Sequence, residues 1–213
     1  MTVKLFSAAP VFLIALALAG CATPNLDNSA GRKVVYQDVS STSNRVAGVG
    51  VESQDVVSMT DRMIRDILAT PQIAGRATPP RIIIDSEYFA NDSSSRINKN
   101  LITDRLRIEL NRAAQGRLVF VARHYGDMVA KERDAKRSGE TDRGTIRSTK
   151  AKAGADFRLG GRITSLDANS AASGTLSRYH QISFELIDLE YETIAWSGLF
   201  EFKKEAQDDV LYR

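Results

Sequence analysis

The C-terminal part of the chain contains three stretches in which apolar and polar side chains alternate. Alternation with a period of two is typical of strands that bury one face against a core. The apolar positions are Phe157, Leu159, Ile163, Ile182, Phe184, Leu186, Ile194, Trp196, Leu199 and Phe200. Because three or more strands with an apolar face form a stable unit, we expect one sheet here. Gly160-Gly161, within the first stretch, predicts a bulge or the close approach of another backbone.

Helical spacing precedes these strands. Residues 53–69 carry an apolar stripe, and Ser53 or Asp55 can cap the start of that helix. Asn98 is the expected cap of a second helix that runs to about residue 114.

Four shorter stretches complete the pattern. Apolar runs at residues 81–85 and 118–122 predict two strands, the first of them buried, and residues 127–137 and 145–153 predict two further helices. This order of elements predicts a mixed α/β fold in which helices pack on a sheet.

The first 20 residues have the composition of a bacterial export signal. Lys4 precedes a short apolar run, which is well below the ~20 residues needed to span a bilayer. The run ends in Leu18-Ala19-Gly20-Cys21, which resembles the lipobox of bacterial lipoproteins and contains the only cysteine of the chain. Cys21 is therefore the expected lipidation site. A plain signal peptide or an uncleaved anchor is the alternative.

The rest of the chain divides into three parts. Residues 21–33 are the expected lipidated cysteine and tether, and residues 22–33 reach about 40 Å when fully extended. Residues 34–52 have strand-like content and are either an added strand or hairpin, or more tether. Residues 53–213 are the expected globular domain. Since residue 22 is Ala rather than Asp, the lipobox resemblance implies anchorage in the outer membrane, facing the periplasm.

No residue set supports catalysis or metal binding. A single cysteine excludes an internal disulfide and a multi-cysteine zinc site. His124 and His180 lack an accompanying nucleophile or carboxylate motif, so we interpret both as surface histidines. Asp188, Glu190 and Glu192 have a spacing that would place three oxygens on one face of a strand, but no calcium-loop pattern accompanies them. The chain is predicted not to be an enzyme and to use no cofactor or metal.

The charge distribution is mixed. The 29 basic residues stand against 26 acidic ones, which is not the footprint of a nucleic-acid-binding protein. Arg143, Arg147, Lys150 and Lys152 give one region a basic bias. Two interpretations remain open for that region: an ordinary solvated surface, or a contact for an acidic partner or an anionic wall polymer.

Four stretches follow the lipobox in a recognisable order: residues 58–68, 82–91, 152–157 and 184–198. Together they resemble the LpoB family, the outer-membrane lipoprotein activators of penicillin-binding proteins, over about residues 53–204. The resemblance implies a fold similar to the N-terminal domain of TolB, a sheet covered by helices. It also implies a non-enzymatic role: docking on a small regulatory domain of a class A penicillin-binding protein, which stimulates peptidoglycan synthesis.

Two features depart from the family. The tether is short and contains only Pro24, where the best-known members have a long proline-rich tether. Tyr191-Glu192 stands where members usually have glycine before the tryptophan strand, so we expect that turn to be longer or differently built.

The polar loop of residues 91–98 is the expected partner contact, with Asn91, Arg96 and Asn98 as the candidate residues. Asn98 also has its alternative role as a helix cap. The alternative function is that of an envelope assembly or secretion lipoprotein related to CsgG. A pore of that kind needs paired amphipathic membrane hairpins, and the late strands are already needed for the core of the domain.

Overall fold

The computed structural model describes residues 36, 38–39, 48–147, 149, 151–170 and 175–207. The chain divides into two compact units, Met1–Tyr36 and Gln37–Arg213, and all the helices and strands given below belong to the second. The expected signal peptide, Cys21 and the tether lie outside the described residues. Within the described part, no helix combines the length and the apolar composition that crossing a membrane requires.

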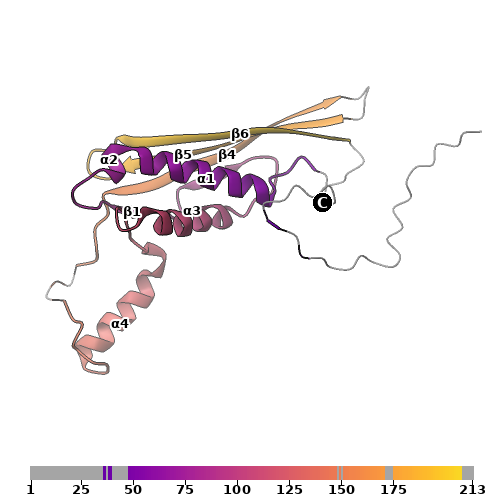
Figure 1. The fold of residues 1–213 in the computed structure, drawn as a ribbon. Helices are drawn as coiled ribbons and strands as arrows, with labels where there is room; N and C mark the ends of the chain where they lie inside the picture. The colour runs from indigo at the N-terminus through magenta and orange to yellow at the C-terminus, as the bar shows by residue number, and fades with distance from the viewer. Residues whose placement is uncertain are drawn as a thin grey trace, which may run out of the picture. The chain divides into compact units, whose positions relative to one another are not determined.

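The strands form a single mixed sheet (Figure 1). They are β1 (Arg81–Ile83), β2 (Phe89–Asp92), β3 (Val119–Phe120), β4 (Phe157–Ser170), β5 (Thr175–Asp188) and β6 (Ile194–Gln207). The strand order is β3-β1-β4-β5-β6, and β2 also pairs with β4, further along that strand than β1. The pairings among β1 to β4 are parallel, whereas β4, β5 and β6 form a long antiparallel meander.

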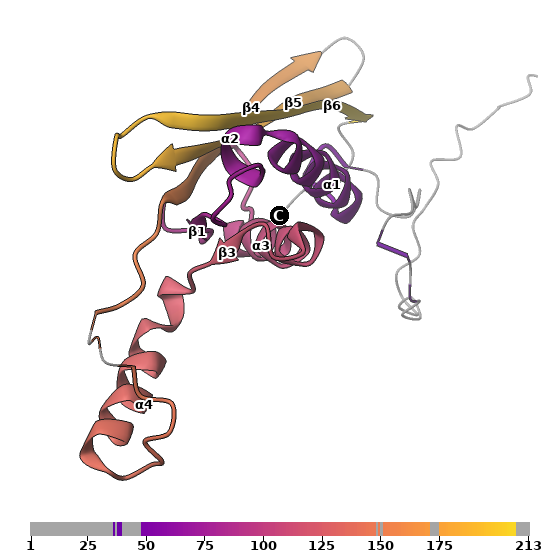
Figure 2. The ribbon, with the colours of Figure 1, turned by 60° about the vertical axis from the view of Figure 1, so that its left-hand side comes forward.

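The helical elements are α1 (Ser53–Ala69), α2 (Pro71–Ala74), α3 (Lys99–Ala114), the 3₁₀ turn η1 (Arg123–Tyr125) and α4 (Gly126–Ser138). Helices α1 and α3 cover one face of the sheet, whereas α4 has no buried residue and extends away from the sheet (Figure 2). Figures 1 and 2 show α1 and α3 side by side on the same side of the meander. The prediction of a mixed α/β fold with helices on a sheet is confirmed.

The two packed helices begin at polar caps. Glu52 is the N-cap of α1, and its backbone N–H donates to Oδ2 of Asp55 at 2.8 Å, so the cap stands one residue before the expected Ser53. Asn98 caps α3 as predicted, because its side chain accepts the backbone N–H of Asn100 at 3.1 Å. The apolar stripes of both helices then face the sheet and are buried.

The core lies between these helices and the strands. Phe157, Leu159 and Ile163 of β4 point into it, as do alternate residues of β5. The rings of Phe89 and Phe184 stack there with their centroids 5.1 Å apart. Gly161 lies between their strands, paired with both residues, and its missing side chain leaves room for the stack.

In the turn between β5 and β6, Glu192 adopts a backbone conformation that is typical of glycine. Glu192 has φ = 55°, the left-handed conformation that glycine adopts without strain. Its backbone N–H donates to the carbonyl of Asp188 at 3.0 Å, and the Asp188 side chain accepts the N–H of Glu190 at 2.9 Å. The turn therefore keeps the backbone shape that favours glycine although glutamate occupies the position.

Replacing Glu192 with glycine is expected to stabilise the domain. A non-glycine residue in the left-handed region costs about 1–2 kcal/mol, and the extra freedom of glycine in the unfolded chain offsets part of that gain. We expect urea denaturation to show a rise of about 0.5–1 kcal/mol in the free energy of unfolding. Glu190→Gly, at a neighbouring turn position with no positive φ, serves as the control and should not raise it.

The prediction of a helix over residues 145–153 is wrong. In residues 145–153, the described residues 145–147, 149 and 151–153 are not helical. Arginine side chains bind their carbonyls instead: Arg133 donates to Thr149 at 3.3 Å and to Ala151 at 3.4 Å, and Arg123 donates to Ala153 at 2.8 Å. The stretch also lacks an apolar stripe to bury, so tertiary hydrogen bonds decide its conformation.

The residues that immediately precede α1 are part of the packed domain. Val49 is fully buried, and its carbonyl lies 2.6 Å from Nε2 of His180, which is itself fully buried on β5. Lys204 of β6 binds the next carbonyl, that of Gly50, at 3.0 Å. The interpretation of His180 as a surface histidine was therefore wrong, because a residue 131 positions away covers it.

Acid is expected to weaken the fold through His180. The Val49 carbonyl can only accept, so Nε2 carries the proton, and buried Nδ1 has no hydrogen-bond partner in the described part of the chain. Burial lowers the pKa of His180 below its ordinary value, because a second proton would lie on that unpartnered nitrogen. The neutral side chain thus contributes stability above the ordinary histidine pKa of about 6.5, and that contribution is lost as the pH falls from there toward the folded-state pKa.

Urea denaturation at a series of pH values between about 7.5 and 5 tests this expectation. His180→Gln keeps a donor for Val49 and should flatten the pH dependence of the unfolding free energy. Equal curves for wild type and His180→Gln would contradict the assignment.

Candidate functional site

The loop that follows β2 is built by the side chain of Asn91. Its Nδ2 donates to the Ser95 carbonyl at 2.9 Å, and its Oδ1 accepts the backbone N–H of Ser93 at 3.2 Å. Asn91 itself lies in β2, one residue before the strand ends, so the loop starts later than the sequence indicated. Asn91 is half-buried and holds the loop in shape.

Arg96 is the exposed cation of this loop. No side-chain hydrogen bond or ion pair of Arg96 is present among the residues that the structure describes. Its neighbour Ile97 packs against the core, and Asn98 caps α3. Of the three predicted contact residues, Asn91 and Asn98 thus have roles within the fold, and Arg96 is available to a partner.

Contacts with the sheet hold the loop in place. The backbone N–H of Ser94 donates to Oγ of Ser165 on β4 at 2.9 Å, and Arg178 on β5 donates to Oγ of Ser95 at 2.8 Å. Arg178 also pairs with Asp167, and this hydrogen bond lowers the pKa of the Asp167 carboxyl. Arg96 therefore projects from a fixed loop rather than from a loose one.

A groove of about 760 Å³ lies on the sheet face opposite the helices. The even-numbered residues of β4 point toward it, since their odd-numbered neighbours face the core. Gly160 leaves it open, because a Cβ built there would meet only the Tyr88 carbonyl, at 3.6 Å. The groove is lined by Tyr88, Arg158, Leu159, Gly160, Gly161, Arg162, Thr164, Gln181, Ser183, Glu185, Ile187 and Leu189.

Charged and aromatic side chains form the rim of this groove. Arg158 lies over the Tyr88 ring, 4.4 Å from its centroid, and pairs with Asp85 at 3.0 Å and with Glu87. Arg162 pairs with Asp92, the last residue of β2, at 3.2 Å. This pair joins the groove to the loop that carries Arg96. We call the groove and the loop of residues 91–98 together the docking surface.

This groove was not predicted from the sequence. The alternation in residues 157–163 shows that one set of side chains leaves the core, but it does not show that the outward face stays uncovered. Gly160-Gly161 was the available signal. The expected close approach is confirmed for Gly161, whose added Cβ would lie 2.4 Å from the Ser183 carbonyl.

The other titratable candidates do not assemble a reactive centre. His124 is exposed in η1, and its Nε2 lies 2.6 Å from Arg107. Asp188 ends β5, whereas Glu190 and Glu192 lie in the turn, so the three carboxylates do not share one face of a strand. Within the described part of the chain, no three His, Cys, Asp or Glu residues come together as metal ligands would.

Comparisons with known proteins give a family match and several similar solved structures. A family model described as peptidoglycan-synthase activator LpoB matches residues 55–202. Among solved structures, the LpoB C-terminal domain from Salmonella enterica is 19% identical (70% of this chain, 98% of that one, TM-score 0.39). The LpoB C-terminal domain from Escherichia coli is 17% identical (70% and 98%, TM-score 0.41). A search of curated proteins finds no match.

Proposed function

The chain belongs to the LpoB family of peptidoglycan-synthase activators, and we propose that it binds and activates a class A penicillin-binding protein. The observation that carries this proposal is the family match over residues 55–202, which spans the domain from α1 into β6. The family is one of regulatory activators, so the proposed role is docking without catalysis. An activator of this kind binds the active conformation of its partner more tightly than the inactive one.

The docking surface is the proposed contact with the regulatory domain of the synthase. Its composition supports this role: Tyr88 and Arg158 are of the residue types enriched in protein interfaces, and apolar Ile187 and Leu189 lie among them. The groove also lies on the sheet face away from α1 and α3, and Arg96 stands in the adjoining loop. Asn91 and Asn98 support the contact by fixing the loop.

Membrane attachment completes the proposal. Family members are outer-membrane lipoproteins, and we propose Cys21 as the lipidated residue of this chain, after removal of residues 1–20. Residues 22–48 separate Cys21 from buried Val49, and a stretch of that length spans at most about 95 Å when fully extended. We expect radiolabelled palmitate to enter the wild-type chain expressed in a Gram-negative host and not to enter Cys21→Ala.

A binding assay tests the function. The chain from residue 22 retains the complete unit of residues 37–213, and it is titrated against immobilised class A penicillin-binding proteins of the same organism. We expect saturable binding that weakens about tenfold in Arg96→Ala, the size of effect produced by losing one charged hydrogen bond in an interface. Arg65→Ala, which removes an exposed arginine from α1, is the control and should bind like the wild type.

A further inference from the structure

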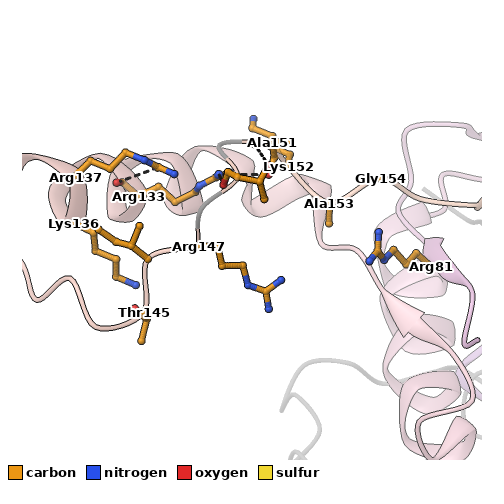
Figure 3. Close-up of a pocket in the computed structure, with 12 residues that line it drawn as sticks. Arg81, Arg133, Lys136, Arg137, Thr145, Arg147, Ala151, Lys152, Ala153 and Gly154 are labelled. Atoms are coloured by element: carbon orange, nitrogen blue, oxygen red, sulfur yellow. Dashed lines mark hydrogen bonds between the residues drawn. The ribbon is translucent and has the colours of Figure 1, made fainter.

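A second hollow, of about 410 Å³, lies between α4 and the segment that follows it (Figure 3). The segment contributes residues 145–147, 149 and 151–154, and β1 contributes Arg81. We call this hollow the basic cleft. Its described lining has no Asp or Glu, and it contains six basic residues: Arg81, Arg133, Lys136, Arg137, Arg147 and Lys152.

Arginines build the cleft by binding neutral groups. Arg133 holds the carbonyls of Thr149 and Ala151 at 3.3 and 3.4 Å, and Arg123 holds that of Ala153 at 2.8 Å. These bonds fasten the segment to α4 and to η1. Because a carbonyl has no net charge, the bonds fix the shape of the cleft without cancelling its positive charge.

The remaining cations of the lining are only partly compensated. Lys136 pairs with Glu132 at 3.3 Å, and Arg137 donates to the carbonyl of Arg133 at 3.3 Å. In the described part of the chain, the side chains of Arg147 and Lys152 have no hydrogen bond or ion pair. Figure 3 shows the Arg147 side chain extending away from the segment that carries it. Figure 3 also shows that the basic side chains point in different directions, so the cleft carries a positive charge spread over several groups, and that charge attracts an anion.

We propose that the basic cleft binds the phosphate group of a small phosphorylated molecule or lipid headgroup. A phosphate monoester carries about −1.5 to −2 charges and three acceptor oxygens, which suits a cleft that has several cations and no Asp or Glu in its described lining. Guanidinium groups bind phosphate oxygens through paired N–H donors. A volume of about 410 Å³ admits a headgroup or a sugar phosphate rather than a folded partner. This site is separate from the docking surface and does not depend on the proposed function.

Calorimetric titration with inorganic pyrophosphate tests the proposal, using the chain from residue 22. We expect saturable binding that weakens at higher salt. The double variant Arg147→Gln/Lys152→Gln should reduce the affinity about tenfold or more, because it removes two charged donors. The matched control, Arg62→Gln/Arg65→Gln, removes the same charge from exposed positions of α1 and should bind like the wild type.

Vesicle sedimentation distinguishes the two sources of phosphate. The same variants are mixed with phosphatidylcholine vesicles that contain or lack phosphatidic acid, whose headgroup is a phosphate monoester. Binding of pyrophosphate alone would identify a soluble ligand, and binding of the anionic vesicles alone would identify a headgroup; either supports the cleft if the double variant loses it. Binding in neither arm, or equal losses in the double variant and its control, would overturn the proposal. Circular dichroism melting confirms that each variant is folded.

Discussion

Replacing Gly161 with alanine is expected to destabilise the domain by about 3 kcal/mol, near the upper end for overpacking a core. The new Cβ would lie 2.4 Å from the Ser183 carbonyl and 2.7 Å from the Phe89 ring. The carbonyl belongs to β5, which is paired with β4 along its whole length, so it has little freedom to move. The ring is held by its stack on Phe184.

Urea denaturation of this variant gives the change in unfolding free energy. Gly154→Ala is the control, because a Cβ at that glycine would have nothing within 4 Å. Its unfolding free energy should stay within about 0.5 kcal/mol of the wild type. A Gly161→Ala midpoint equal to that of the wild type would show that β4 and β5 are not packed as described.

A substitution at the adjacent glycine, Gly160, is expected to affect binding rather than folding. Gly160→Leu should leave the fold intact and strongly weaken binding to the synthase. A Cβ at Gly160 lies at an ordinary contact distance of 3.6 Å from the Tyr88 carbonyl, and the rest of the side chain would extend into the groove. An occupied groove excludes the partner from the centre of the docking surface, where truncations and insertions have their largest effects on affinity.

We expect the affinity of Gly160→Leu for the synthase to fall about 100-fold or more, equivalent to about 3 kcal/mol. Gly154→Leu adds the same side chain outside the groove and should bind normally. Retained binding by Gly160→Leu, with a wild-type melting curve, would place the contact elsewhere on the domain. Loss of binding accompanied by loss of the fold would contradict the claim that Gly160 faces open space.

The local parts of the fold were predictable from the sequence. The bounds of α1 and the cap of α3 follow from patterns within a few residues, and the long strands of the meander follow from their alternation. A separate strand at β2 was not predicted, and its last two residues were placed in the polar loop, because its parallel partner lies about 70 residues away on β4. Short-range patterns carry no information about such a pairing.

The candidate site was predictable only in part. The polarity of residues 91–98 identified the loop, but its fixed shape depends on contacts with Ser165 and Arg178, which are distant in sequence. Burial of His180 depends on Val49, and the form of residues 145–153 depends on Arg123 and Arg133. In each case a long-range hydrogen bond overrides the local preference.

We propose that this chain activates a peptidoglycan synthase through the docking surface. The most direct test measures the rate of glycan polymerisation from lipid II by each class A penicillin-binding protein of the organism, with increasing amounts of the chain. We predict a saturable rise in rate with wild type and with Gly154→Leu, and a much smaller one with Gly160→Leu at the same concentrations. An unchanged rate with wild-type protein for all of these synthases would contradict the account and favour a different envelope-assembly partner.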